Sequence, residues 1–412
     1  MNRRQFIALS ALGLGASLTA HLNAAQPPFR IRTITAGIAP RGADDLSELD
    51  TATAFLEHAK ARFEPIYIVQ TTRIATTPLA EFMPDWQSTA AIERIIALDQ
   101  RAQAAGTPLS VGPVLTGDDP VEAFGSWAGR VIRATQNVSF SVFAASDRIG
   151  IHHATIRAAA ETTATLARET PGGEGNFRFC ATANCPPGSP FFPAAYHQGP
   201  RAFSIGLESP ELLAAAVDGS ASLEAARRAM KEHLNAALAP IEAMAEDLAA
   251  ETGWRYRGID SSPAPGLDAS IGAVIETISG VPFGAPATLA ACAAITSALQ
   301  DLDVKTCGYS GLMLPVLEDR VLAQRASEGR YGVSNLLLYS SVCGTGLDVV
   351  PLPGDTPEHT LAAIIEDVAT LSLRYRKALS ARLFVVPGSK VGDEVSFDNP
   401  YLTESHVLAP DS

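Results

Sequence analysis

Short apolar runs alternate with longer amphipathic stretches along the chain from residue 29 onward. The short runs are rich in β-branched and aromatic residues, which is typical of strands. They are 31–38, 66–74, 109–115, 138–145, 177–183, 202–207, 256–260, 307–314, 335–342 and 382–386. The helix-like stretches between them include 46–62, 89–105, 120–135, 154–168, 222–251, 285–300, 315–328 and 357–380. This alternation predicts an α/β fold with much parallel strand pairing.

The number of strand-like runs allows either one large barrel-like sheet or two doubly wound units. Proline and glycine stand singly at the ends of elements, and no stretch has the composition of a linker. We therefore predict a single domain over residues 26–412, an α/β barrel of about ten strands with surrounding helices. A helical lobe is expected around residues 220–252, where one long amphipathic helix is predicted.

The N-terminus has the pattern of an export signal. Arg3 and Arg4 form a twin-arginine pair, an apolar stretch covers 6–20, and Ala24 and Ala25 offer a cleavage site. Residues 1–25 are thus predicted to be a twin-arginine signal peptide, cleaved near Ala25 after recognition by the export machinery, with a periplasmic product. A retained membrane anchor is the alternative, although the apolar stretch is shorter than the roughly 20 residues of a span. No stable membrane insertion is expected of the mature chain.

Composition narrows the class of function. Of the 412 residues 47% are hydrophobic and 18% charged, as in a globular protein, and the net charge of -13 disfavours nucleic acid. The sequence contains no P-loop, no GxGxxG after the first strand, no GxSxG and no HExxH. Five cysteines do not make a disulfide scaffold, and whether Cys180 and Cys185 pair stays open.

The segment 336–356 is the strongest candidate for a site. It is predicted to be a buried strand that ends at Cys343 and continues through Gly344-Thr345-Gly346 to Asp348. Glycines allow backbone N–H groups to turn toward a ligand. Cys343 is therefore either a catalytic nucleophile or a buried structural cysteine, and Gly344 and Gly346 are candidate binding residues.

Several carboxylates follow other strand-like runs. Asp348 and Asp355 have the residue type that holds a divalent cation or acts as acid and base, although Asp355 also fits an N-cap before the next helix. Asp260, with Ser261 beside it, and Glu208 each stand at the end of a predicted strand. Because ligands bind at the carboxyl ends of strands in such folds, we expect these residues to meet Cys343 at one mouth.

Three further polar residues are candidates. His197 ends a proline-stiffened loop, 186–197, and is either a general acid or part of a covering loop. Asn184 precedes this loop as a candidate polar contact. Arg73 lies within a strand, where an unpaired cation is costly, so it either binds a substrate anion or pairs with one of the acids.

Several short motifs match a known family. They are CGTGLD at 343–348, PLPGD at 351–355, CGYSGLM at 307–313, LED at 317–319 and PFFPAAYH at 190–197. In these motifs, spread over most of the chain after residue 30, the sequence resembles the family called domain of unknown function 711, which is described as pyruvate formate-lyase-like. The resemblance implies a large α/β barrel related to glycyl-radical enzymes. It implies little about function.

The chain departs from the glycyl-radical pattern in two places. The radical glycine segment is absent from 382–412, and Cys343 stands alone where pyruvate formate-lyase has paired cysteines. A glycyl radical would also be lost in an oxygen-exposed compartment. The expected barrel therefore lacks the radical, and Cys343 either does polar chemistry or lines a pocket.

The leading hypothesis is an exported lyase or hydrolase acting on a small polar or anionic metabolite. Its site inside the barrel would be formed by Cys343, Asp348, Asp260, Glu208 and His197, with Arg73 as an anion clamp. The cofactor is unknown, and a divalent cation held by the carboxylates is one hypothesis. The alternative is a periplasmic protein that binds a small molecule or metal without catalysis. Homo-oligomer formation is left open by the sequence.

Overall fold

The computed structural model describes residues 29–266 and 269–411. The predicted signal peptide lies outside the described residues. No helix in the described part of the chain combines the length and apolar character needed to cross a membrane.

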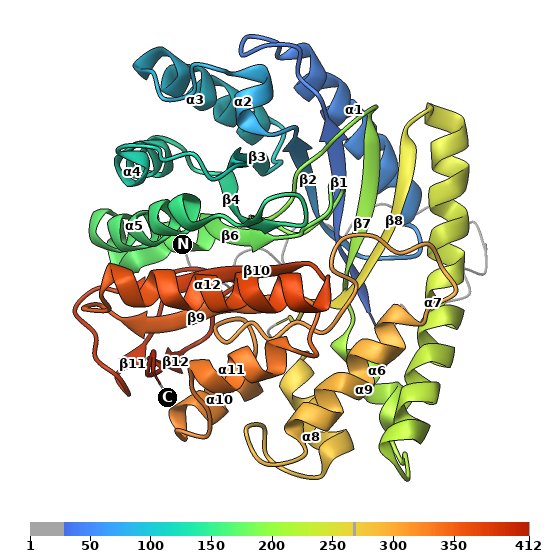
Figure 1. Ribbon diagram of the computed structural model, residues 1–412. Helices are drawn as coiled ribbons and strands as arrows, with labels where there is room; N and C mark the ends of the chain where they lie inside the picture. The colour runs from blue at the N-terminus through green and yellow to red at the C-terminus, as the bar shows by residue number, and fades with distance from the viewer. Residues whose placement is uncertain (1–28, 267–268, 412) are drawn as a thin grey trace, which may run out of the picture.

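A large mixed sheet forms the centre of the molecule (Figure 1). Its order is β8-β7-β1-β2-β3-β4-β6-β10-β9, and the short β5 pairs with β4. The strands are β1 Arg30–Ile38, β2 Val69–Thr76, β3 Leu109–Leu115, β4 Val138–Ser146, β5 Gly150–Ile151, β6 Phe179–Ala183, β7 Ala202–Glu208, β8 Arg255–Pro263, β9 Gly346–Pro353 and β10 Leu379–Val386. The predicted α/β class with a large sheet is confirmed.

Strand direction changes twice across this sheet. β1, β2, β3, β4 and β6 run parallel, whereas β7 is antiparallel to β1 and β10 is antiparallel to β6. The carboxyl ends of β7, β8, β9 and β10 therefore lie at the edge where the five central strands begin. The carboxyl ends of the strands thus lie on two opposite sides of the sheet, one for the five central strands and the other for β7–β10.

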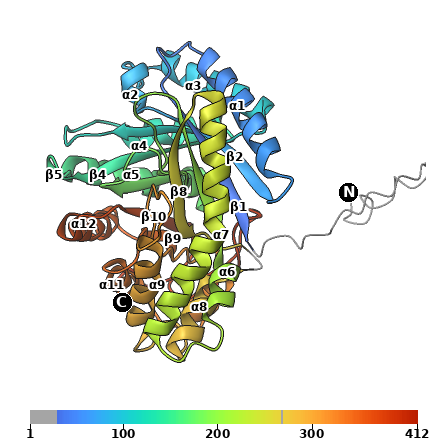
Figure 2. The ribbon, with the colours of Figure 1, turned by 90° about the vertical axis from the view of Figure 1, so that its right-hand side faces the viewer.

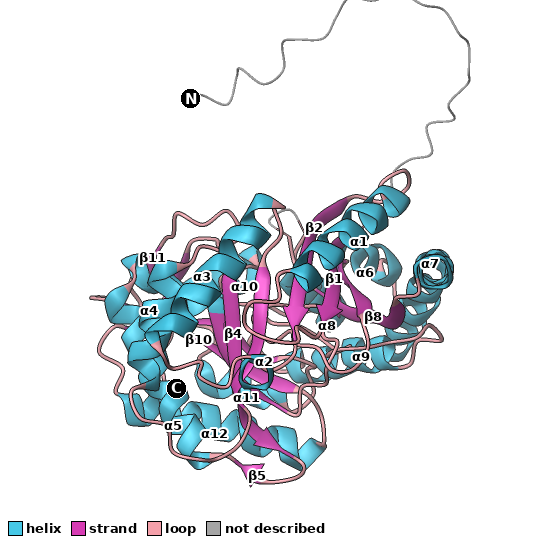
Figure 3. Ribbon diagram, turned by 90° about the horizontal axis from the view of Figure 1, so that it is seen from above, coloured by secondary structure: helices cyan, strands magenta, loops and turns pink. Residues whose placement is uncertain are grey.

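Helices cover the sheet and build a lobe beside it. In Figure 1, α4, α5 and α12 stack side by side, and the view from above in Figure 3 shows helices surrounding the strands. The helices are α1 Ser47–Phe63, α2 Leu79–Phe82, α3 Thr89–Ala104, α4 Phe124–Ala134, α5 His153–Glu169, α6 Pro210–Val217, α7 Leu223–Thr252, α8 Ile271–Ser279, α9 Thr288–Gln300, α10 Arg320–Ser327, α11 Val333–Ser340 and α12 Glu358–Tyr375. A kinked 3-10 segment, Pro171–Arg178, and a small hairpin, β11 Glu394–Val395 with β12 Ser405–His406, complete the described elements.

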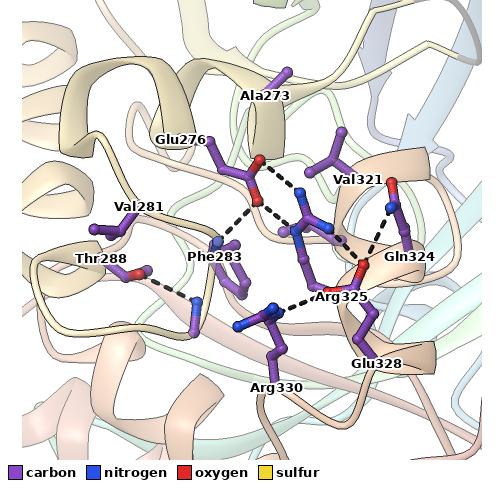
Figure 4. Close-up of polar contacts among 12 residues, drawn as sticks. Ala273, Glu276, Val281, Phe283, Thr288, Val321, Gln324, Arg325, Glu328 and Arg330 are labelled. Atoms are coloured by element: carbon purple, nitrogen blue, oxygen red, sulfur yellow. Dashed lines mark hydrogen bonds and ion pairs between the residues drawn. The ribbon is translucent and has the colours of Figure 1, made fainter.

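The predicted helix 222–251 is α7, which packs along β8 and contacts α6, α8 and α9 (Figure 2). Ion pairs fasten α8 to α10 in the same region (Figure 4). Glu276 accepts from Arg325 through both carboxylate oxygens, at 2.6 and 2.9 Å, and from the Phe283 N–H at 2.8 Å. These contacts join helices that are far apart in sequence.

The predicted closed barrel is not found in the described residues, since the sheet's strand path begins at β8 and ends at β9. The segment 305–316 occupies the space between these edges and bonds to both. Ile259 of β8 donates to the Lys305 carbonyl, and Val316 donates to the carbonyl of Asp348 in β9. The predicted strand 307–314 is this segment, which makes only isolated bridges because Gly308, Gly311 and Pro315 interrupt a ladder.

The predicted strand 335–342 is wrong, because these residues form most of α11. Leu336-Leu337-Leu338 contains no β-branched residue, and a short apolar run does not distinguish a helix from a strand by pattern alone. The strand of this region is β9, which begins after Cys343 instead of ending at it.

Candidate functional site

A cavity of about 780 Å³ lies against the central sheet. Volumes of this order are typical of small-molecule sites. Strand residues of its wall are Arg32, Thr71, Arg73, Ser139, Cys180, Asp348, Ser380 and Arg382. The loop residues Phe191, Phe192, Tyr309, Met313, Glu318 and Tyr401 also line it. The cavity therefore combines apolar surface with a small set of charged groups.

Strand alternation positions the polar residues of the wall. Thr71 and Arg73 are two residues apart on β2, and so are Ser380 and Arg382 on β10, so each pair shares one face of the sheet. Ile74 and Ala381, on the opposite face, belong to the hydrophobic core. Side chains alternate between the two faces of each strand, so one face lines the cavity and the other packs into the hydrophobic core.

Arg382 binds two carboxylates at the cavity wall. Its Nε donates to Asp348 Oδ1 at 2.6 Å and its Nη2 donates to Glu318 Oε1 at 2.7 Å. The side chains of Arg382, Asp348 and Glu318 are 8%, 9% and 11% exposed. Burial lowers the pKa of Arg382, but the two carboxylates outweigh it and raise that pKa overall. Burial also raises the pKa of Glu318, against the lowering effect of Arg382.

Arg73 has no such partner. Among the described residues it makes neither a hydrogen bond nor an ion pair through its guanidinium, which lies over the Phe192 ring at 5.2 Å from the centroid. Burial and the neighbouring charge of Arg32 lower the pKa of Arg73 to about 10, so it stays charged at neutral pH. A charged guanidinium with free N–H donors in a cavity wall is an anion-binding group.

The other arginines of the wall are satisfied by the protein. Arg32 donates to Glu208 Oε2 at 3.2 Å and to Gln70 Oε1 at 3.0 Å, and stacks on Tyr401. Arg178 donates to Thr135 Oγ1 and to the carbonyls of Ile132 and Val138. These residues shape the wall, and Arg73 is the guanidinium left for a ligand in the described structure.

Cys180, Cys185 and Tyr309 pack together beside the cavity. Both cysteines are free thiols, and burial raises their pKa values, that of Cys185 to about 12. Both groups are therefore neutral at physiological pH. Neither is poised as a nucleophile.

Asp260 was predicted to be catalytic, but it does not line the cavity. Its carboxylate accepts from the backbone N–H groups of Tyr309 at 2.8 Å, Ser310 at 2.9 Å and Ser262 at 3.1 Å. Burial raises the pKa of Asp260 in spite of these hydrogen bonds. The geometry assigns Asp260 to holding the turn that carries Tyr309.

Cys343 is fully buried and lies in the core, not in the cavity wall. Its Sγ accepts from the Gly346 N–H at 3.4 Å. Gly344 packs against Gly311, where a Cβ would lie 2.3 Å from the Gly311 Cα. Gly346 has φ +88°, and a Cβ there would meet the Ser380 carbonyl at 2.3 Å. Both glycines permit close backbone packing, a role that the prediction of a ligand-binding loop missed.

Glu208 and His197 were expected to line one site, and they do not meet there. Glu208 pairs with Arg30 at the start of β1, whereas the His197 N–H donates to Thr76 at the end of β2, so they lie at opposite edges. Glu208 accepts from Arg30, Arg32 and Gln70. Burial lowers the pKa of His197, whose Nε2 lies 2.9 Å from the Gly199 carbonyl.

The remaining predicted contacts also lie outside the cavity wall. Asn184 accepts from the Asp147 N–H and donates to Ser372, joining the end of β6 to α12. Ser261 donates to the Leu299 carbonyl. Asp355 is exposed in the turn before α12. No cluster of three His, Cys, Asp or Glu side chains suited to a metal ion exists among residues 29–266 and 269–411, so the hypothesis of a divalent cation has no ligand set there.

The geometry thus brings together Arg73 and Asp348 from the predicted set, and adds Arg382 and Glu318. Arg382, like Arg73, is a lone cation inside an apolar strand. The argument that identified Arg73 would therefore have identified Arg382 from the sequence as well. Glu318 falls within the predicted helix 315–328. It instead lies in the turn before α10, which begins at Arg320.

Comparison with known proteins extends over nearly the whole chain. The family described as "Uncharacterised ACR (DUF711)" matches residues 24–399. A UPF0210 protein of Pyrobaculum islandicum is 31% identical over 346 residues, 79% of this chain and 75% of that protein. A UPF0210 protein of Neisseria gonorrhoeae is 26% identical over 402 residues, 90% of this chain and 89% of its own. None of these descriptions states an activity.

Proposed function

The chain belongs to the uncharacterised DUF711 family, as its motifs predicted, and from that premise we propose that its cavity binds a small anionic metabolite. The unpaired guanidinium of Arg73 carries this proposal. A half-buried cation without a partner has lost part of its hydration, and a ligand carboxylate or phosphate would offset that loss through charge-assisted hydrogen bonds. The mixed apolar and charged wall supports a small organic anion as the ligand.

We further propose that the protein is a lyase or hydrolase in which Glu318 transfers the proton. Its Oε1 is held by Arg382 while Oε2 accepts no hydrogen bond from a described residue, and its raised pKa suits acid–base work. In a lyase, Glu318 would take a proton from the carbon beside the ligand's anionic group. The C–H electron pair would form a double bond, and the leaving group would depart with its bonding pair. In a hydrolase, the same carboxylate would take a proton from water as the water oxygen bonds to an acyl carbon or phosphorus of the ligand. The leaving group would depart with its bonding pair and receive that proton.

Binding without catalysis is the second candidate. It is favoured by the burial of Cys343 outside the cavity and by the neutral state of Cys180, because no activated nucleophile faces the ligand. Export by the twin-arginine route and a periplasmic location remain proposals that rest on residues 1–25. A common origin with the glycyl-radical barrel remains a proposal as well.

A thermal-shift screen of small carboxylates and phosphates, followed by calorimetry, tests the binding proposal. Arg73→Gln should weaken the best ligand about tenfold to a hundredfold, because hydrogen bonds to charged groups contribute about 1.5–3 kcal/mol. Arg41→Gln is the matched control, since Arg41 is 81% exposed and pairs with Asp45 away from the cavity. Absence of any ligand whose affinity depends on Arg73 would refute the proposal.

Glu318→Gln separates catalysis from binding once a ligand is known. If the protein is an enzyme, the variant should lose turnover even when the ligand, still bound through Arg73, is at a saturating concentration. If turnover of that ligand is absent in the wild-type protein as well, the cavity only binds.

A further inference from the structure

Two carboxylate oxygens at the cavity wall are left without hydrogen-bond donors. Arg382 occupies Glu318 Oε1 and Asp348 Oδ1, whereas Glu318 Oε2 and Asp348 Oδ2 accept nothing from the described residues. Both residues line the same cavity as Arg73. The wall therefore offers a free donor group and two free acceptor atoms.

The charges around these atoms are balanced. Arg32, Arg73 and Arg382 supply three cations, and Glu208, Glu318 and Asp348 supply three anions. Arg30 also pairs with Glu208, but its side chain is 44% exposed, so water solvates its charge. Glu318 interacts electrostatically with Arg382, Asp348, Arg32 and Arg73, which come from β10, β9, β1 and β2. Arg178 interacts with Asp99 and not with this group, and Asp398 is an exposed residue of the cavity's lining. A ligand with only a negative charge would leave the buried group with an excess of negative charge.

We propose that the ligand is a zwitterion of the amino-acid class, with its carboxylate at Arg73 and its ammonium group at Glu318 Oε2 and Asp348 Oδ2. This inference rests on the proposed function and narrows its substrate class. A zwitterion satisfies the free donor and both free acceptors, and it leaves the net charge of the buried group unchanged. An anion without an ammonium group satisfies Arg73 alone.

The apolar part of the cavity suits the body of such a ligand. Phe191, Phe192 and Met313 line the wall beside the charged residues. The volume of the cavity exceeds that of a single phosphate or acetate, so an amino acid with a large apolar side chain, or a short peptide, is accommodated. Amino acids with a phenyl or isobutyl side chain are therefore suitable probes.

Proton uptake distinguishes the two kinds of ligand. A bare anion adds negative charge near Glu318 and raises its pKa further, so binding draws a proton from the buffer. A zwitterion brings a positive charge to the same carboxylate, so the pKa of Glu318 is not raised and no proton is taken from the buffer. Calorimetry in two buffers of equal pH and different ionisation enthalpy measures the number of protons taken up on binding.

The experiment compares phenylalanine with phenylpropionate, and leucine with isocaproate, on the full-length protein. Each amino acid should bind about tenfold more tightly than its partner, because the ammonium group forms charge-assisted hydrogen bonds. The carboxylates should take up protons on binding and the amino acids should not. Glu318→Gln should reduce this preference while sparing the carboxylates, and the exposed Asp355→Asn should leave both unchanged.

Equal affinity within both pairs, or a preference that survives Glu318→Gln, would overturn the inference. The binding proposal would still stand if the carboxylates bound and lost affinity in Arg73→Gln. If no amino acid, carboxylate or phosphate bound in a manner that depends on Arg73, the proposed function itself would fail.

Discussion

Arg382→Met tests whether the ion pairs at the cavity wall are as buried as the geometry indicates. Methionine keeps much of the length of arginine but carries no charge, so the substitution removes the one cation that is hydrogen-bonded to both Glu318 and Asp348. In the wild-type protein their bonds to Arg382 are 2.7 and 2.6 Å long. The guanidinium also lies over the Phe177 ring at 4.9 Å from its centroid.

Removing one partner of a buried ion pair costs about 3–5 kcal/mol of unfolding free energy, because a charge is left buried and unpaired. The lost cation–π contact with Phe177 adds about 0.5–2 kcal/mol. Partial protonation of the carboxylates offsets part of this cost. We therefore expect Arg382→Met to lose about 3–5 kcal/mol at neutral pH.

The pH dependence follows from the direction of the Glu318 shift. Its pKa in the folded protein is raised above the ordinary value of 4.5, and the variant raises it further. Between the unfolded and folded pKa values the folded state binds more protons, so its stability falls as the pH rises. The loss caused by Arg382→Met should be smallest below the unfolded pKa and largest above the folded pKa.

Urea unfolding, monitored by tryptophan fluorescence at several pH values, measures the loss of unfolding free energy and its dependence on pH. Adding Glu318→Gln and Asp348→Asn to the variant should recover most of the loss, since no unpaired charge then remains. A loss below about 1 kcal/mol that does not change with pH would show that these ion pairs are not buried, because exposed pairs behave that way.

Three further outcomes are expected elsewhere in the chain. Asp260→Asn should lower the unfolding free energy by about 1–3 kcal/mol in urea, because it leaves a buried N–H group unpaired; an unchanged midpoint would argue against its structural role. Cys343 should resist iodoacetamide in the native protein and react after unfolding, as mapped by peptide mass spectrometry; rapid native labelling would contradict its burial. Gly344→Ala should cost about 1–3 kcal/mol, whereas Gly42→Ala, where a Cβ meets nothing within 4 Å, should be nearly neutral; similar effects would exclude the tight backbone contact.

The fold was predictable where the pattern was unambiguous. The alternating run at 109–115 matches β3 residue for residue, and the capped amphipathic run at 89–105 matches α3 within one residue. The leucine run at 335–342 was ambiguous and forms a helix. Closure of the sheet could not be predicted, because it depends on whether a glycine-rich segment pairs as a ladder or by isolated bridges.

The site was predictable only in part. Arg73 was found because a charge inside an apolar strand requires either a partner or a ligand. Asp348 was found because a carboxylate after Gly344-Thr345-Gly346 has the residue type of a metal ligand or an acid–base group. Asp260 and Cys343 have residue types suited to catalysis, but Asp260 binds the backbone N–H of Tyr309, which is distant in sequence, and Cys343 is buried in the hydrophobic core. Neither contact can be recognised from the neighbouring sequence. The reversal of β7 and β10 relative to the central strands could not be predicted either. The carboxyl ends of β7–β10 therefore lie opposite to those of the central strands, and not all strand ends face one mouth.

The most direct test of the central claim is a crystal structure with the tightest carboxylate ligand of the screen. We expect the ligand's carboxylate within hydrogen-bonding distance of the Arg73 guanidinium, with Arg382 still bound to Asp348 and Glu318. A ligand bound elsewhere, or an Arg73 paired with a protein carboxylate in the complex, would contradict it.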